Sequence, residues 1–228
     1  MQELYTDSRQ ASARPEAVSK LLRNTYMLLG MTLLFSAATA GLSMALNLGH
    51  GIAMICSIAA LVLVWFVLPK TANSSTGLMV VFAFTGLLGA ALGPMLNHYL
   101  AMPNGASVVM QALGGTALVF FGLSGYVLTT GKDFSFMGGF LMTGLIVVIV
   151  AAIGAMIAGL FGVEVSMFRL AISGAVVLLM SGFILFDTSR IINGGETNYI
   201  YATTALYLDI YNLFTSLLHI LGFLNSDD

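Results

Sequence analysis

Two aspartates lie in strongly apolar surroundings near the end of the sequence. Asp187 closes the run "GFILFD", and Asp209 lies in the stretch 202–223 with Asn212, Ser216 and His219. Two carboxylates close together in a low-dielectric setting cannot both ionise cheaply, so such a pair titrates as a unit. The chemistry predicted for this pair is a pH-sensitive latch that shares a proton, or a transient cation site.

The polar residues of the last stretch share one side of a predicted helix. At about 100° per residue, Asn212, Ser216 and His219 fall within roughly 80° of Asp209. This stripe must face protein or water, which predicts that the last helix is central. His219 is more typical of an interfacial hydrogen bond than of a metal ligand. A simpler alternative for Asp187 is that it faces interfacial water near Arg190.

Other chemistry is not indicated by the sequence. The three histidines are dispersed and the one cysteine, Cys56, lies in an apolar run. We therefore expect neither a cofactor nor a metal site beyond a transient cation. No GxSxG, HExxH or phosphate-loop motif is present, so an enzyme is not predicted. Without a basic stripe, no nucleic-acid partner is expected.

Composition defines the class of protein. Hydrophobic residues make up 58% of the 228 and charged residues 8%, with a mean hydropathy of +0.96. Soluble domains carry about 25% charged residues. The apolar runs are about 20 residues long and do not alternate, which predicts membrane-spanning helices. The fold class is therefore all-α and polytopic, with a mobile cytoplasmic tail at 1–19 and one seven-helix domain at 20–228. The seven predicted spans are 21–46, 51–68, 78–96, 108–129, 134–161, 168–186 and 202–224.

The distribution of Lys and Arg predicts the orientation. Seven of these residues lie on one side of a seven-span arrangement, and Arg169 alone lies on the other. The positive-inside rule places the N-terminus in the cytoplasm and the C-terminus outside. A six-span arrangement with a re-entrant last segment would move only the C-terminus.

Small residues predict where helices pack closely. Gly89 and Gly93 have GxxxG spacing, and Gly86 extends the stripe. Small residues let helix backbones approach in lipid. Gly154 and Ala158 predict a similar contact for the fifth span.

Three long stretches resemble the Bax inhibitor-1 (transmembrane BAX inhibitor motif) family. They are "VFAFTGLLGAALGPMLNHYL" (81–100), "LGGTALVFFGLSGYVLTTGKDFSFMGGFL" (113–141) and "FILFDTSRIINGGETNYIYATTALYLDIYNLFTSLLHILGF" (183–223). Together with the seven-span hydropathy, the likeness covers nearly the whole chain from about residue 20. Within the family, "KTANSSTG" (70–77) and "INGGETNYI" (192–200) look closest to the bacterial YccA type.

The resemblance implies two activities. YccA-type proteins bind and restrain FtsH, the membrane-anchored AAA protease of the bacterial inner membrane, which engages their exposed cytoplasmic tail. Other members behave as pH-sensitive calcium leak channels with two aspartates on the last two helices, to which Asp187 and Asp209 correspond. Their arginine lock on the second span has no match, because this span ends "VWFVLPKTA" with Lys70 as the nearest cation. We therefore expect a pH-sensing site or ion pathway that involves the two acids and the polar residues Asn212, Ser216 and Lys70. Lys does not replace Arg in bidentate pairing. We expect an FtsH modulator in contact with membrane lipid, with the calcium leak as the alternative.

Overall fold

Helices account for all the regular structure in the described part of the chain. The computed structural model describes the backbone of residues 2–225 and the side chains of residues 16–225. The α-helices are α1 (Gln2–Ala45), α2 (His50–Val62), α3 (Leu68–Thr71), α4 (Ser75–Leu100), α5 (Gly105–Thr130), α6 (Gly138–Leu160), α7 (Ser166–Ile192) and α8 (Tyr199–Asn225). A π-helical turn, η1 (Leu63–Val67), joins α2 to α3, and a 3₁₀ turn, η2 (Ser135–Met137), precedes α6. The all-α prediction is confirmed.

Seven of the helical segments are long and apolar enough to cross a membrane, as predicted. The second of them, His50–Thr71, combines α2, η1 and α3. Its π turn precedes Pro69, whose ring clashes with the carbonyl four residues earlier in a regular α-helix. The N–H of Leu68 donates to the carbonyl of Leu63, five residues back, so the wider turn lets the span continue past the proline.

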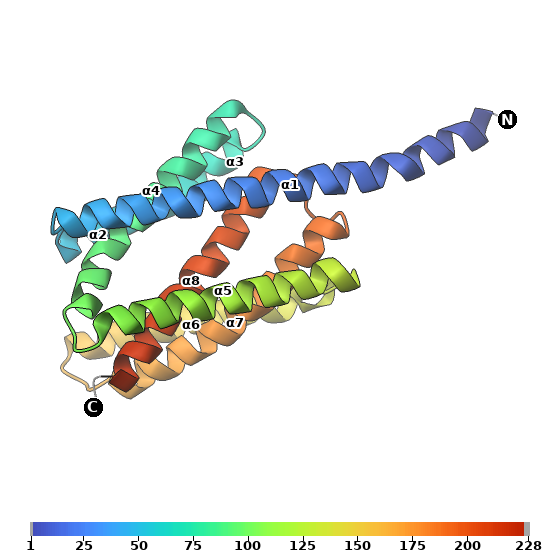
Figure 1. Cartoon of the computed structure of the whole chain (residues 1–228). Helices are drawn as coiled ribbons and strands as arrows, with labels where there is room; N and C mark the ends of the chain where they lie inside the picture. Colours follow the sequence, from blue (N-terminus) through green and yellow to red (C-terminus); the bar gives the residue numbers. More distant parts are fainter. Residues whose placement is uncertain (1, 226–228) are drawn as a thin grey trace.

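The last helix occupies the centre of the bundle, as the polar stripe predicts. α8 packs against α1, α4, α5 and α7 (Figure 1). Buried side chains recur along its whole length, from Ile200 to Gly222. α8 is one unbroken helix of 27 residues, which is long enough for a complete crossing.

The glycine stripe of α4 lies against α1. A Cβ at Gly86 would stand 2.7 Å from the ring of Phe35, and one at Gly89 would stand 2.8 Å from Cα of Ser36. A Cβ at Gly93 would collide with Ser43. The two helices can approach this closely because α4 lacks side chains along this line.

The small residues of α6 pack differently from the prediction. A Cβ at Gly154 would meet no atom within 4 Å, so the contact predicted for Gly154 and Ala158 is wrong at the glycine. Ala155 is instead the buried small residue of this stretch. Gly154 therefore lies on the outward side of the bundle, where lipid would cover it.

The predicted tail is continuous with the first helix. α1 begins at Gln2, but only its part from Glu16 to Ala45 is apolar enough to cross a membrane. No break in the helix marks residue 20, and the division of the chain at 19/20 stays a prediction.

Candidate functional site

The candidate site lies between α7 and α8, which are antiparallel neighbours in extensive contact. Asp187 lies near the end of α7, and Asp209 lies ten residues into α8. The connection between the helices is the short loop 193–198, so the end of α7 lies beside the first turns of α8.

The structure brings the two aspartates together. Their carboxyl groups lie close enough to interact directly. Asp209 is only 5% exposed, and its Oδ2 has no hydrogen-bond partner within the described residues. Because a carboxylate only accepts hydrogen bonds, two carboxyls can be bonded to each other only if one carries a proton. The geometry therefore fits a pair that holds a single proton.

Arg190 is the cation beside this pair. Its guanidinium lies 3.9 Å from Oδ1 of Asp187 and 3.7 Å from Oε2 of Glu196. Its Nη2 also donates to the carbonyl of Gly195 at 3.1 Å. The arginine thus connects the acid pair to the α7–α8 loop.

Lys70, the cation at the end of the second span, forms no ion pair within the described side chains and is exposed. The cation that does pair with Asp187 comes from α7 itself, because Arg190 lies one turn beyond it. Spacing of three residues along a helix places two side chains on the same face. A part for Lys70 in an ion pathway stays a prediction.

The residues that follow Asp187 fasten α7 to other parts of the bundle. Thr188 hydrogen-bonds Ser124 of α5 at 3.2 Å, and Ser124 is in turn bonded to the hydroxyl of Tyr26 of α1. Ser189 accepts a hydrogen bond from the N–H of Phe134 at 2.8 Å. Each side chain of the run "DTSR" therefore contacts a different part of the protein. These contacts hold the end of α7, and with it Asp187, in place.

Ser189 also contacts the loop before α6. It donates to Asp133 at 3.3 Å. Hydrogen bonds from Ser135, reinforced by the one from Ser189, hold the pKa of Asp133 below its usual range. The sequence analysis did not predict these contacts. The four polar residues at the end of an apolar span could have indicated them.

The polar stripe of α8 faces α7 but is not one connected network. Nδ1 of His219 lies 2.9 Å from Oγ of Ser173 on α7, consistent with a hydrogen-bonding residue. Asn212 donates to the carbonyl of Leu208 in its own helix at 2.8 Å, and Ser216 is buried. Neither Asn212 nor Ser216 has a hydrogen bond to an acid within the described side chains. Their role in an ion pathway stays a prediction.

Seven helices able to span a membrane, with two neighbouring aspartates between the last two of them, define an integral membrane protein with an ionisable site inside the bundle. The family model described as "Inhibitor of apoptosis-promoting Bax1" matches residues 18–226. The chain belongs to this family, the Bax inhibitor-1 family.

Bacterial relatives align over almost the full chain. This chain is 52% identical over 208 residues to "Modulator of FtsH protease YccA" of Escherichia coli K12. The alignment covers 91% of this chain and 92% of the relative. The chain is 55% identical to an uncharacterized membrane protein of Vibrio cholerae, with 92% of both chains covered. An uncharacterized protein of Pseudomonas aeruginosa is 48% identical over the whole of both chains.

The names of these relatives agree with the fold. A second relative from Escherichia coli, 52% identical, is named an inner membrane protein. With seven helices able to span, the chain is a multi-pass protein of the inner membrane. The names of the Vibrio and Escherichia relatives describe membrane proteins and a protease modulator, and they describe no enzyme.

Proposed function

We propose that this protein binds FtsH and restrains its proteolysis of membrane proteins. The observation that carries the proposal is the 52% identity, over 91% of this chain, to a protein named as a modulator of FtsH protease. The match to the family model extends from residue 18 to residue 226 and so includes the whole bundle.

The architecture supports a way in which restraint could arise. An AAA protease pulls on an exposed end of its substrate, and the apolar part of this chain begins only at Glu16. We propose that FtsH engages the segment 1–19. The next element pulled would be α1, whose extraction must break the close packing along Gly86, Gly89 and Gly93. A protease that grips an end it cannot extract quickly is occupied, and other substrates are spared.

Deletion of 1–19 tests the engagement. The deletion variant should insert normally and persist longer than the full chain in cells that contain FtsH. Both should have the same lifetime in cells that lack FtsH. Removal of 226–228, at the other end of the chain, is the control and should leave the half-life unchanged. An unchanged half-life after deletion of 1–19 would remove this segment as the engagement site.

Association with FtsH is tested separately. Full-length protein, solubilised gently with proteolytically inactive FtsH, should co-purify with it. Absence of FtsH from the purified complex, in detergent and in nanodiscs, would overturn the proposal itself.

A second function, a pH-sensitive cation leak, is favoured by one observation. Asp187 and Asp209 lie side by side inside the bundle, and Arg190 lies 3.9 Å from Asp187. Loss of the shared proton would leave two negative charges side by side, which repel each other or attract a cation. The pair thus has the chemistry of a pH-dependent gate, with calcium as the cation that carboxylates would suit.

Calcium flux into proteoliposomes tests the leak. Wild-type protein should give a flux that changes between about pH 5 and 8, the range over which a buried carboxyl pair can titrate. The double variant Asp187→Asn with Asp209→Asn should abolish that pH dependence. Glu164→Gln, a carboxylate just before the other end of α7, is the matched control and should behave as wild type. No flux from folded wild-type protein at any pH would exclude the leak.

A further inference from the structure

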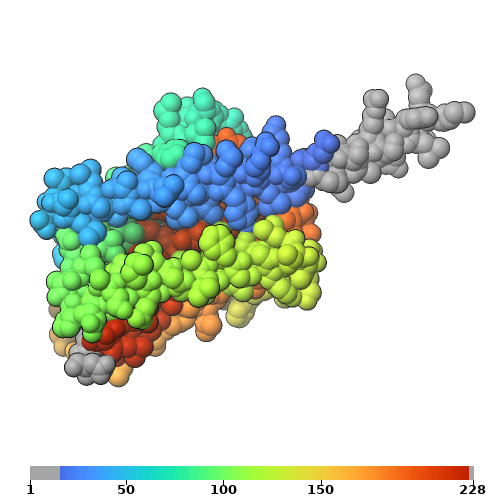
Figure 2. All heavy atoms as spheres, viewed as in Figure 1, coloured from blue at the N-terminus to red at the C-terminus, as the bar shows by residue number. Residues whose placement is uncertain are grey.

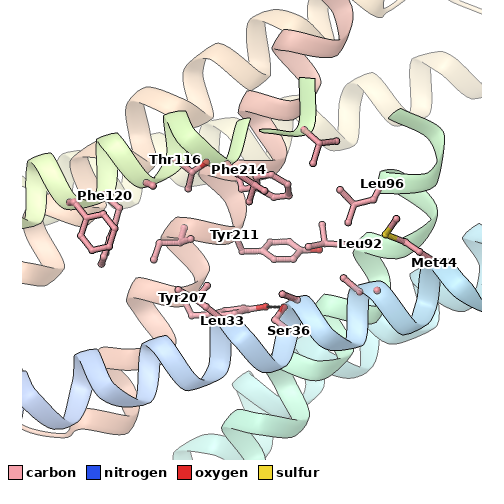
Figure 3. A pocket seen from close by; sticks show the side chains of 18 residues that line it. Leu33, Ser36, Met44, Leu92, Leu96, Thr116, Phe120, Tyr207, Tyr211 and Phe214 are labelled. Carbon is pink, nitrogen blue, oxygen red and sulfur yellow. Dashed lines mark hydrogen bonds between the residues drawn. The ribbon is translucent and has the colours of Figure 1, made fainter. Parts of the chain in front are cut away.

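A pocket opens sideways from the bundle between α1 and α5. The backbones of these helices stay apart within the described residues, and at one end Tyr26 reaches across to Phe120 and Ser124. Figure 2 shows α8, in dark red, in the gap between the blue α1 and the green α5. The pocket has a volume of about 440 Å³, with α8 as its floor and α4 at one end. Figure 3 shows side chains of all four helices, among them Ser36, Leu92, Thr116, Phe120, Tyr211 and Phe214.

The pocket lies at membrane depth and apart from the acid pair. Its lining residues belong to four segments that are able to span the membrane. On α8 it is lined by Tyr207 and Tyr211, each two residues from Asp209 and therefore about 160° away around the helix. The opening thus faces hydrocarbon, and the pocket is on the side of α8 away from the candidate site.

The lining favours an apolar occupant. None of its residues is charged, so an ion that entered would lose its water without gaining a partner. The hydroxyl of Ser36 is bonded to that of Tyr207 at 2.6 Å, and Thr116 donates to the carbonyl of Ala112 at 2.7 Å. The hydroxyl of Tyr211 is the polar group of the lining that has no hydrogen-bond partner in the described part of the chain.

The volume distinguishes between the apolar occupants that a membrane offers. A cavity of about 150 Å³ lined by Leu, Ile and Phe holds one benzene, so about 440 Å³ has room for roughly eighteen carbon atoms. A single turn of α-helix, about 10 Å across and 5.4 Å long, fills roughly 420 Å³. The pocket therefore has room for about one helical turn and cannot take in a whole spanning helix of another protein or of a second copy, whereas it matches the size of one fatty-acyl chain.

We propose that this pocket binds one acyl chain of a membrane phospholipid, inserted between α1 and α5 onto α8. If the pocket were empty, the side chains that line it would lose their dispersion contacts on that side. The adjoining bilayer supplies acyl chains at high concentration to fill it. The bound chain would bridge two helices whose backbones lie apart. Because α1 is also the first helix that a protease would pull, the lipid would help to hold it in the bundle.

Photo-crosslinking from a lipid chain tests the site. The full-length protein is placed in nanodiscs with a phospholipid that carries a diazirine on a palmitoyl chain, irradiated, and its adducts are mapped by mass spectrometry. We expect adducts on Ile210 and Phe214, which lie on the buried floor at 9% and 8% exposure, as well as on the outer faces of α1 and α5. Adducts confined to the outer faces would overturn the proposal.

Two neighbouring positions on α1 provide the variant and its control. Ala37 lines the pocket, whereas Ala38 is on the same helix and does not. Ala37→Phe should reduce the α8 adducts at least fivefold, and Ala38→Phe should leave them unchanged. Equal labelling in the two variants would contradict the proposal. If Ala37→Phe does not fold, Ala117→Phe fills the pocket from α5, with the outward-facing Leu118→Phe as its control.

The Tyr211 hydroxyl distinguishes an acyl chain from a polar ligand. A hydrocarbon chain requires no hydrogen bond, so Tyr211→Phe should keep the α8 adducts. Loss of labelling in this variant, while the protein remains folded, would show that the occupant is held by its polar group and would overturn the assignment to an acyl chain.

Discussion

At the scale of single residues, the protein depends on a buried acid pair that is held in place by its neighbours. Asp187 and Asp209 lie side by side, while hydrogen bonds of Thr188, Ser189 and Arg190 join the end of α7 to three other parts of the chain. Such a frame limits the movement by which the carboxyls could separate. If the pair loses its proton, the two carboxylates repel each other. Because they cannot easily move apart, this repulsion should weaken the packing of α7 against α8.

The pair makes a prediction about stability and pH. The double variant Asp187→Asn with Asp209→Asn should fold, because Asn has nearly the same shape and needs no shared proton. Above neutral pH it should unfold at a higher temperature than wild type, by about 2–4 °C for each kcal/mol of repulsion removed. Thermal unfolding in detergent from about pH 5 to 9 measures this, with Glu164→Gln as control. An equal pH dependence of wild type and double variant would contradict proton sharing.

The sequence allowed the pair and its nearest cation to be predicted, but not the other contacts around it. Two carboxylates in apolar runs joined by a short loop indicate a contact, because antiparallel helices bring such positions together. Arg190 was indicated as the nearby cation by its position three residues after Asp187 on one helix, and the fold shows the two side chains 3.9 Å apart. Hydrogen bonds such as that between Thr188 and Ser124 join residues 64 positions apart, and no local pattern reports them.

At the scale of helices, α1 and α4 form the most extensive contact among the described elements, along the glycines of α4. GxxxG spacing correctly predicted the close helix contact at Gly89 and Gly93. The similar spacing of Gly154 and Ala158 did not predict a contact at Gly154. The difference is that spacing fixes which residues share a face, whereas the position of the helix decides what that face meets. α6 is peripheral and contacts α7, while Gly154 meets no atom within 4 Å.

Gly89 offers a test of this contact. Gly89→Ala would place a methyl group 2.8 Å from Cα of Ser36 and should destabilise the protein by about 1–3 kcal/mol, because backbone cannot move aside cheaply. Gly114→Ala, on α5, has no atom within 4 Å and is the control. Thermal unfolding of both variants should show a lower midpoint for Gly89→Ala alone. Equal midpoints would show that α1 and α4 can separate without loss.

At the scale of the whole molecule, seven helices are able to cross a membrane, and seven crossings would leave the two ends of the chain on opposite sides. Figure 1 shows the start of α1 and the end of α8 at opposite ends of the bundle. The count of crossings could be predicted from apolar runs alone, since each is about the length a bilayer requires. The orientation rests on the clustering of Lys and Arg, and stays a prediction.

Reporter fusions test the orientation. A reporter that is active only in the periplasm should be active when fused after the last residue, and a cytoplasmic reporter at the same place should be silent. The opposite pattern would contradict either the positive-inside assignment or the seventh crossing. A second fusion in the α7–α8 loop, beside Arg190, separates these explanations, because that loop should be cytoplasmic.

The most direct test of restraint is the rate at which FtsH degrades a membrane substrate when this protein is present. FtsH, ATP and a membrane substrate are reconstituted in proteoliposomes with increasing amounts of the full-length chain or of the variant that lacks 1–19. The account predicts that the full-length chain slows degradation of the substrate in proportion to its amount, while the deletion variant has a much smaller effect. A substrate degradation rate that is unchanged at a molar excess of folded full-length protein would contradict it.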